Sequence, residues 1–151
     1  MINTNDIELV KKLILKEQKP IIVKAQNGEF NRNILDYGKF DVLLFPEEGE
    51  TKNDKLKKFD LGLNHVLANI AKKKNIKFGI DIGEIKRLDR KNKGKNLGRI
   101  IEIIDICKKS GVSLICYNYD DERNASAILL SLGASTQQAS EAVKSNYSDG
   151  S

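Results

Sequence analysis

The most concentrated chemical signal in this sequence is a run of positive side chains between residues 86 and 99. Its basic members are Lys86, Arg87, Arg90, Lys91, Lys93, Lys95 and Arg99. Several cations in one segment can neutralise several phosphates, which gives an affinity that falls with salt, and arginine adds forked contacts that lysine cannot make. Asp89 is the one acid of the run, and the interspersed asparagines and glycines predict a flexible loop. We expect this loop to contact RNA or DNA, with a merely solvated charge run as the alternative.

The composition narrows the kind of nucleic acid. The net charge of +5 favours an anionic partner, although a basic surface can also serve solubility alone. Aromatic residues make up 6% of the chain. Recognition of single strands by stacking normally needs aromatic side chains, so we expect contact with a folded backbone instead.

Two carboxylates and one histidine offer a second kind of chemistry. Asp81 and Glu84 follow a predicted strand, where catalytic groups of β/α proteins collect, and together they could hold Mg²⁺. The alternative is a polar pair that faces water or nearby lysines. His65 is the sole histidine, so a zinc site or a triad lacks partners and we expect a structural role for it. The sequence has no GxSxG motif and no P-loop, and we assign no catalytic or metal-binding residue.

The cysteines and the hydrophobic runs predict a cytoplasmic protein. Cys107 and Cys116 lack metal-site spacing, so we interpret them as buried, reduced thiols. The first residues lack the apolar run of a signal peptide, and no stretch approaches the length of a membrane span. We therefore expect no membrane partner.

The apolar patterns that must position these groups alternate between helix and strand. The expected helices cover residues 6–17, 30–38, 63–74, 99–109, 125–132 and 136–145, and the expected strands cover residues 20–25, 40–45, 76–82 and 112–117. Nearly continuous apolar strands separated by helices predict an α/β fold with a parallel sheet and right-handed crossovers. Four strands cannot close an eight-stranded barrel, so we expect an open layer or a partial barrel. We expect one β/α domain over residues 1–146, a polar loop over residues 47–60 and a frayed tail over residues 147–151.

Three segments of the chain resemble a known family. GLNHVL at Gly62–Leu67 is similar to a "G-(I/L)-(D/N)-H-(V/I)-L" helix opening that precedes a strand in the archaeal and eukaryotic ribonuclease P protein component 3 family. RNASAILLSLG at Arg123–Gly133 resembles a later family segment in which an arginine precedes a small apolar helix. SLGASTQQASEAVKSN resembles the closing helices of the family. The resemblance covers residues 61–146.

This resemblance implies a fold and a function. The fold would be TIM-barrel-like and related to the PHP fold, here shortened on its N-terminal side. The protein would be a subunit of ribonuclease P, which removes the 5′ leader from precursor tRNA, and would brace the catalytic RNA beside a small companion protein subunit and other ribonuclease P proteins. Precursor tRNA would be an indirect partner, and Mg²⁺ would serve the RNA active site. The family match adds Arg123 to the basic loop as an RNA contact.

Two alternatives remain open from the sequence. A PHP-like, metal-dependent phosphoester hydrolase would use Asp81, Glu84 and His65, although such an enzyme needs several histidines. A general RNA-binding scaffold would bind RNA without preference for ribonuclease P RNA.

Overall fold

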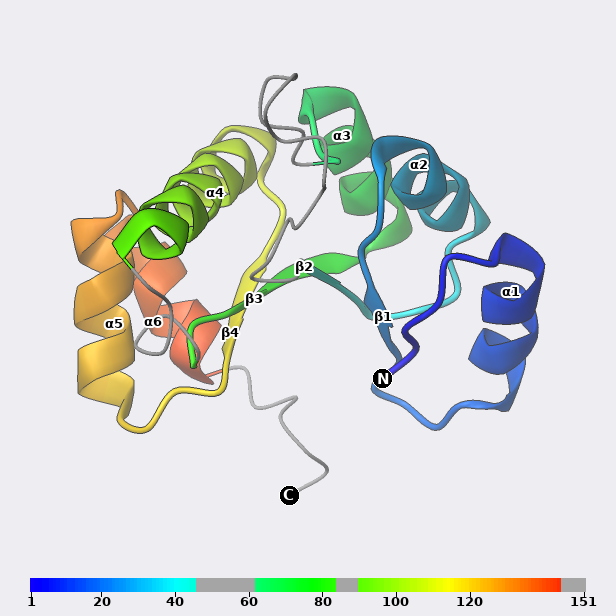
Figure 1. Cartoon of the computed structure of the whole chain (residues 1–151), viewed down its shortest axis with the longest axis horizontal. Coiled ribbons are helices and arrows are strands. Elements are labelled where there is room, and N and C mark those ends of the chain that lie inside the picture. The colour runs from blue at the N-terminus through cyan, green and yellow to red at the C-terminus, as the bar shows by residue number, and fades with distance from the viewer. Residues whose placement is uncertain (46–61, 84–89, 145–151) are drawn as a thin grey trace.

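The computed structural model describes residues 1–45, 62–83 and 90–144, and for residues 90–96 it describes the backbone alone. The strands are β1 (Ile22–Lys24), β2 (Val42–Phe45), β3 (Lys77–Asp81) and β4 (Leu114–Tyr117), and the helices are α1 (Ile7–Lys16), α2 (Gly28–Tyr37), α3 (His65–Lys74), α4 (Arg90–Ser110), α5 (Glu122–Ser131) and α6 (Thr136–Lys144) (Figure 1). This alternation confirms the predicted α/β fold with a parallel β/α array. The predicted loop over residues 47–60 and the predicted frayed tail lie outside the described residues.

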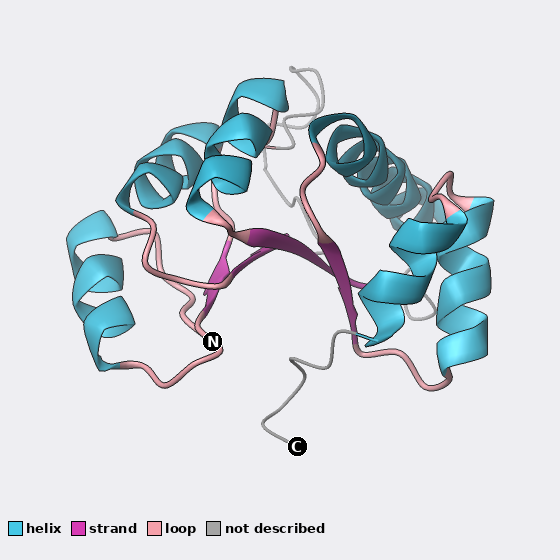
Figure 2. Ribbon diagram, turned by 180° about the vertical axis from the view of Figure 1, so that it is seen from behind, coloured by secondary structure: helices cyan, strands magenta, loops and turns pink. Residues whose placement is uncertain are grey.

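The strands form one parallel sheet in the order β1-β2-β3-β4. Leu43 lies opposite Phe78, and Phe78 lies opposite Leu114, so strands that follow each other along the chain are also neighbours in the sheet. Each crossover therefore moves along the sheet in the same direction, as in a partial barrel and unlike the reversed order of a doubly wound sheet. The sheet is curved, and the helices lie on its convex side (Figures 1 and 2).

The main core fills the layer between the sheet and the helices. Phe78 is fully buried, and its ring meets that of Phe45 edge-on at a centroid distance of 5.3 Å. Ile80 and Leu43 are buried beside it. Burying a side chain of this size stabilises the fold by about 1.5–3 kcal/mol, so this layer is the main attachment of the helices to the sheet.

The opposite face of the sheet carries a smaller apolar cluster around a glycine. Val42 and Tyr117, from strands on either side of β3, pack together over Gly79. A Cβ atom at Gly79 would lie 2.8 Å from Cε2 of Tyr117 and 3.0 Å from Cγ1 of Val42. Any side chain at this position would displace both neighbours, which explains the glycine in the middle of an otherwise apolar strand.

Short polar side chains begin the helices, as their sequence positions predict. Asp6 accepts a hydrogen bond from the backbone N of Leu9 at the start of α1. Ser135 and Gln138 form a reciprocal capping box at the start of α6, with N···O distances of 2.9 and 3.1 Å. Lysine side chains bind backbone carbonyls at the C-terminal ends of two helices. Lys72 Nζ donates to the Gly111 carbonyl after α4 at 3.0 Å, and Lys108 Nζ donates to the Gly133 carbonyl after α5.

One buried asparagine ties three segments together. The side chain of Asn31 is 0% exposed, accepts a hydrogen bond from the backbone N of Gln26 at 2.8 Å and donates to the Gly62 carbonyl at 2.7 Å. These bonds link the end of β1, the first turns of α2 and the segment that leads into α3. Gly62 has a φ of 69°, a conformation that favours glycine, and packs against the Asn31 amide.

We predict that Asn31→Leu lowers the free energy of unfolding by about 3 kcal/mol, because the Gln26 N–H and the Gly62 C=O lose their hydrogen bonds to this buried amide. Urea unfolding monitored by circular dichroism measures the change. Asn33→Leu, at an exposed position of the same helix, is the matched control and should change stability by less than about 0.5 kcal/mol. Equal effects of the two substitutions would contradict the assigned role of Asn31.

Candidate nucleic-acid interface

The carboxyl ends of β3 and β4 lie side by side, and polar groups follow both. Asp81 pairs with Tyr117 in the sheet register. The Asp81 carboxylate accepts a hydrogen bond from the backbone N of Gly83 at 2.9 Å and one from Asn118 Nδ2 at 2.5 Å. Asn118 has a φ of 60°, a left-handed conformation that asparagine tolerates better than most residues. Both carboxylate oxygens of Asp81 are therefore engaged by neighbouring turns.

The sequence alternative of a Mg²⁺ pair at this edge stays a prediction, because Glu84 lies outside the described residues. Within the described ranges, no group of three or more histidine, cysteine, aspartate or glutamate side chains is arranged to hold a metal ion. We interpret Asp81 as a hydrogen-bond acceptor that stabilises the turns after β3 and β4.

The predicted flexible basic loop is wrong from residue 90 onward, where the structure has helix α4, 21 residues long. The reason is an apolar stripe that starts earlier than the expected helix. Leu97 packs against the core, and Ile100, Ile104 and Cys107 continue the same spacing. These contacts outweigh the low helix propensity of the interspersed glycines and asparagines, an example of tertiary packing overriding local preference.

The correction changes how the basic residues are presented. Lys86 and Arg87 lie outside the described residues, whereas the other cations of the run lie on α4 within about 14 Å along its axis. Those residues are Arg90, Lys91, Lys93, Lys95 and Arg99. The described backbone therefore places them on a rigid element and not on a flexible loop.

The first turn of α4 is basic. It contains no acidic residue, although the positive end of a helix dipole favours negative groups. The first turn of α5, by contrast, begins with Asp121 as its cap and Glu122. Cations at a helix N-terminus cost stability unless an anion lies nearby, and free backbone N–H groups there suit a phosphate. An anion near the start of α4 would offset this unfavourable charge.

The last two predicted RNA contacts along the chain, Arg99 and Arg123, differ in their surroundings. Arg99 is half-buried on α4. Arg123 is exposed in the first turn of α5, where its backbone N donates to Asp121 at 3.0 Å. Three exposed acids, Asp120, Asp121 and Glu122, precede Arg123 directly and weaken its attraction for phosphates. Both helices start from the same edge of the sheet, because they follow adjacent strands.

His65 begins α3 with an exposed side chain. It lines a cavity of about 530 Å³ between α3 and α4, together with Glu102 and Asp105. Asp105 is paired with Lys109 at 3.0 Å. Within the described part of the chain the imidazole makes no hydrogen bond, so its expected structural role stays a prediction.

The cysteines are confirmed as buried free thiols. Burial raises the pKa of Cys107 to about 12. Burial, with a smaller contribution from the Asp81 charge, raises the pKa of Cys116 to about 12 as well. Both thiols are neutral near pH 7 and are poor nucleophiles.

The comparisons with known proteins differ between sequence and structure. The sequence matches no family model and no curated protein. The structure is similar to a chain in the cryo-EM structure of archaeal ribonuclease P with mature tRNA, with a TM-score of 0.73 and 18% sequence identity. The match covers 97% of this chain and 63% of that chain, so this chain spans less than two thirds of its neighbour. At this identity the likeness establishes a shared fold.

Sequence reasoning missed the polar contacts that join distant segments. The bond between Asn118 and Asp81 and the lysine bonds to helix ends connect residues 25–39 positions apart. The one signal for the Asn118–Asp81 bond was an asparagine directly after a strand, where a left-handed turn is common.

None of the helices in the described ranges has the length and apolar character that a membrane span requires.

Two glycine substitutions test whether the basic segment is helical in solution. A Cβ added at Gly98 meets no atom within 4 Å, so Gly98→Ala should raise the free energy of unfolding by about 0.5–1 kcal/mol if Gly98 lies inside a helix. Gly133 has equal space but a φ of 107°, so Gly133→Ala should destabilise the protein instead. Thermal and urea unfolding measure both. A neutral or destabilising effect of Gly98→Ala would argue for a loop.

Proposed function

We propose that this protein is a protein subunit of ribonuclease P that assists the catalytic RNA in removing the 5′ leader from precursor tRNA. The observation that carries the proposal is the shared fold with a chain of archaeal ribonuclease P in complex with mature tRNA, which extends over 97% of this chain. The sequence resemblance at Gly62–Leu67 and Arg123–Gly133 supports a ribonuclease P protein independently.

The charge arrangement on α4 supports an RNA-facing role. Its first three turns are rich in lysine and arginine, and its first turn lacks the acids that a helix N-terminus prefers. RNA phosphates would supply the missing negative charge. The low aromatic content favours contact with a folded RNA backbone over stacking on single strands.

The proposal also divides the chemistry between protein and RNA. Asp81 is engaged by two neighbouring turns, and both thiols are buried and neutral. We assign the cleavage and its Mg²⁺ to the RNA subunit. The protein lowers the electrostatic cost of bringing RNA phosphates together. Its partners are ribonuclease P RNA, a small companion protein subunit and other ribonuclease P proteins, precursor tRNA is an indirect partner, and the site of action is the cytoplasm.

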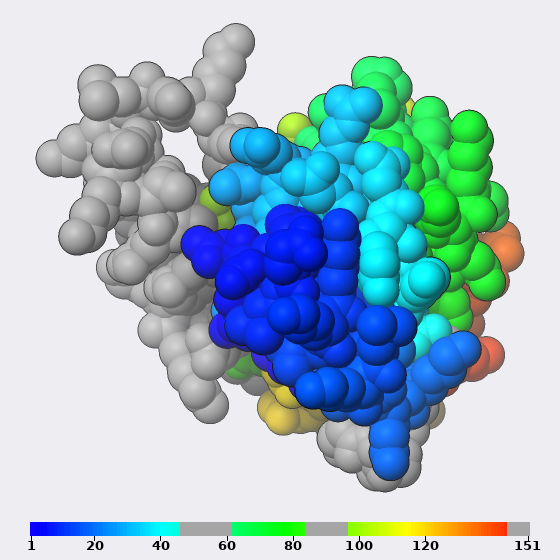
Figure 3. All heavy atoms as spheres, turned by 90° about the vertical axis from the view of Figure 1, so that its right-hand side faces the viewer, coloured from blue at the N-terminus to red at the C-terminus, as the bar shows by residue number. Residues whose placement is uncertain are grey.

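The test is precursor-tRNA cleavage by reconstituted ribonuclease P RNA at low Mg²⁺, with and without this protein and its companion subunit. The triple variant Lys91→Glu, Lys93→Glu, Lys95→Glu reverses the charge of α4. A matched control reverses three exposed lysines on and just after α1, namely Lys12, Lys16 and Lys19. Figure 3 shows the N-terminal part of the chain, in blue, on the face that carries α1. We expect the unaltered protein and the α1 control to lower the Mg²⁺ requirement and the α4 variant to lose this effect.

A salt titration of RNA binding tests whether the cations of α4 contact phosphates. Each lost phosphate contact should make the slope of log affinity against log salt shallower by about 0.7–0.9. The α4 variant should lose two to three such contacts relative to the α1 control, which has the same net charge.

Other outcomes would identify the alternatives. If neither the protein nor its companion changes cleavage, the proposed function is wrong. Equal affinity for unrelated folded RNAs would indicate a general RNA-binding scaffold. Phosphoester hydrolysis by the isolated protein, abolished by Asp81→Asn, would indicate the metal-dependent hydrolase.

A further inference from the structure

A second group of lysines lies at the amino edge of the sheet, opposite the edge from which α4 starts. Each helix between two parallel strands runs back to this edge, so the ends of α2, α3 and α4 lie there together. Lys72, Lys73 and Lys74 form the last turn of α3, and Lys39 follows α2 by two residues. All four side chains are exposed. We call these four residues the amino-edge lysines.

Contacts between neighbouring elements make the amino-edge lysines one continuous surface. Helix α3 lies between α2 and α4 (Figure 1). The aliphatic stem of Lys74 crosses Gly38, since a Cβ atom at Gly38 would lie 3.3 Å from Lys74 Cδ. Lys72 Nζ donates to the Gly111 carbonyl at 3.0 Å, directly after the end of α4. The surface therefore runs from the end of α2, across the end of α3, to the end of α4.

A tyrosine extends this surface toward α1. Lys39 Nζ lies 5.3 Å from the centre of the Tyr37 ring, and Lys11 Nζ lies 5.4 Å from the same centre. The negative face of an aromatic ring attracts cations. The ring thus holds two ammonium groups beside the end of α2.

Positive charge predominates on this surface. Within the described ranges, none of the amino-edge lysines has an ion-pair partner. Asp36 and Asp41 flank Lys39 in the sequence, and the Asp41 carboxylate accepts a hydrogen bond from the backbone N of Ile21 at 2.6 Å. The acids of these segments are therefore fewer than the lysines.

Helix dipoles explain only part of this arrangement. A cation in the last turn of a helix is favoured by about 0.3–1 kcal/mol. That preference explains individual lysines at helix ends. It does not explain why unpaired lysines from two segments meet on one surface, where like charges repel each other.

The composition of the surface favours a polyanion over a folded protein as its partner. The large apolar side chains that are exposed in the described part of the chain all lie outside residues 37–39 and 72–75. Protein interfaces are depleted in lysine and usually have an apolar centre. Lysine ammonium groups bind phosphates as point charges. The RNA backbone is the polyanion that the proposed function supplies.

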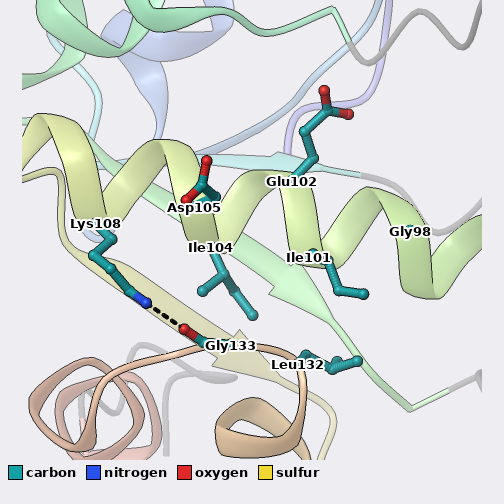
Figure 4. Close-up of a pocket in the computed structure, with 8 residues that line it drawn as sticks. All are labelled: Gly98, Ile101, Glu102, Ile104, Asp105, Lys108, Leu132 and Gly133. Atoms are coloured by element: carbon teal, nitrogen blue, oxygen red, sulfur yellow. Dashed lines mark hydrogen bonds between the residues drawn. The ribbon is translucent and has the colours of Figure 1, made fainter.

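The length of α4 separates this surface from the basic start of α4. Lys93 lies about 25 Å along the helix axis from Ser110, which is next to the carbonyl that Lys72 binds. This separation is about three Debye lengths at physiological salt, so each group of cations attracts phosphates independently. Glu102 and Asp105 project from the middle of α4 and interrupt the basic surface (Figure 4).

We propose that the amino-edge lysines bind a second segment of RNA backbone, so that one protein bridges two RNA segments at the two ends of α4. This inference rests on the proposed function for the identity of the polyanion. It adds a second contact surface and a geometry to that function. The rigid helix between the two surfaces sets the distance between the RNA segments.

The experiment counts the short RNA hairpins that one chain binds, by sedimentation, and measures energy transfer between donor-labelled and acceptor-labelled hairpins. The amino-edge variant carries Lys39→Glu, Lys73→Glu and Lys74→Glu, and it keeps Lys72 because of the bond to Gly111. We expect the unaltered protein to bind two hairpins per chain and to give energy transfer. The amino-edge variant and the α4 variant should each bind one hairpin per chain and lose the energy transfer.

The matched control reverses three scattered exposed cations, Lys12, Arg32 and Lys144. It has the same net charge as the amino-edge variant and should still bind two hairpins. Circular dichroism and the unfolding midpoint check that every variant folds. A neutral form of the amino-edge variant, with glutamine at the same three positions, keeps the test valid if the glutamates disturb folding. It should weaken binding of the second hairpin about tenfold.

Three results would overturn the proposal. One hairpin per chain for the unaltered protein would mean a single RNA surface. Two hairpins per chain for the amino-edge variant would mean that these lysines are not the second surface. Binding of polyglutamate that is lost in the amino-edge variant, with one hairpin per unaltered chain, would assign the surface to an acidic protein.

The cleavage assay at low Mg²⁺ separates this inference from the proposed function. Two hairpins per chain without any effect on precursor-tRNA cleavage would support the bridging and contradict the proposed function. A lower Mg²⁺ requirement that the amino-edge variant retains in full, with one hairpin per unaltered chain, would contradict the bridging and support the proposed function.

Discussion

The parallel pairing of consecutive strands is the constraint on which the rest of the structure depends. Because β3 and β4 are parallel neighbours, their carboxyl ends meet at one edge of the sheet, where Asp81 and Asn118 lock the two following turns together. Helices α4 and α5 both begin after these turns. A shift of one residue in the register would turn every strand side chain to the other face, removing Phe78 from the helix layer and closing the space over Gly79. The position of the basic residues thus rests on the backbone pairing of the sheet.

Helix α4 divides two chemistries along its length. Its first turns carry the cations, and its middle turns carry Ile101, Glu102 and Asp105. The helix is fixed to the core through Leu97, Ile100, Ile103 and Ile104. This inner stripe sets the orientation of the helix, while its outer positions bear basic side chains at both ends and acidic side chains between them.

The fold was largely predictable from the sequence because its signals are local. Apolar runs bounded by glycine and proline marked the strands, and short polar residues such as Asp6 and Ser135 marked helix starts. The candidate site was predictable in composition but not in form. Gly94 and Gly98 have low helix propensity and therefore predict a loop. The helix forms because Leu97 packs against the core, a contact that depends on the folded sheet. The contacts of Asn31 with Gly62 and of Asn118 with Asp81 join residues more than 30 positions apart, so no local pattern encodes them.

The helical form of the basic segment alters the physics of the proposed RNA contact. A flexible loop would lose about 1–2 kcal/mol of backbone conformational entropy per residue on being ordered against RNA. Residues 90–99, already helical, avoid most of that loss, but the protein then carries the cost of cations at the positive end of the helix dipole. In the proposed complex, RNA phosphates at this end would relieve the cost. The charge arrangement that disfavours the free helix start would then also favour the bound state.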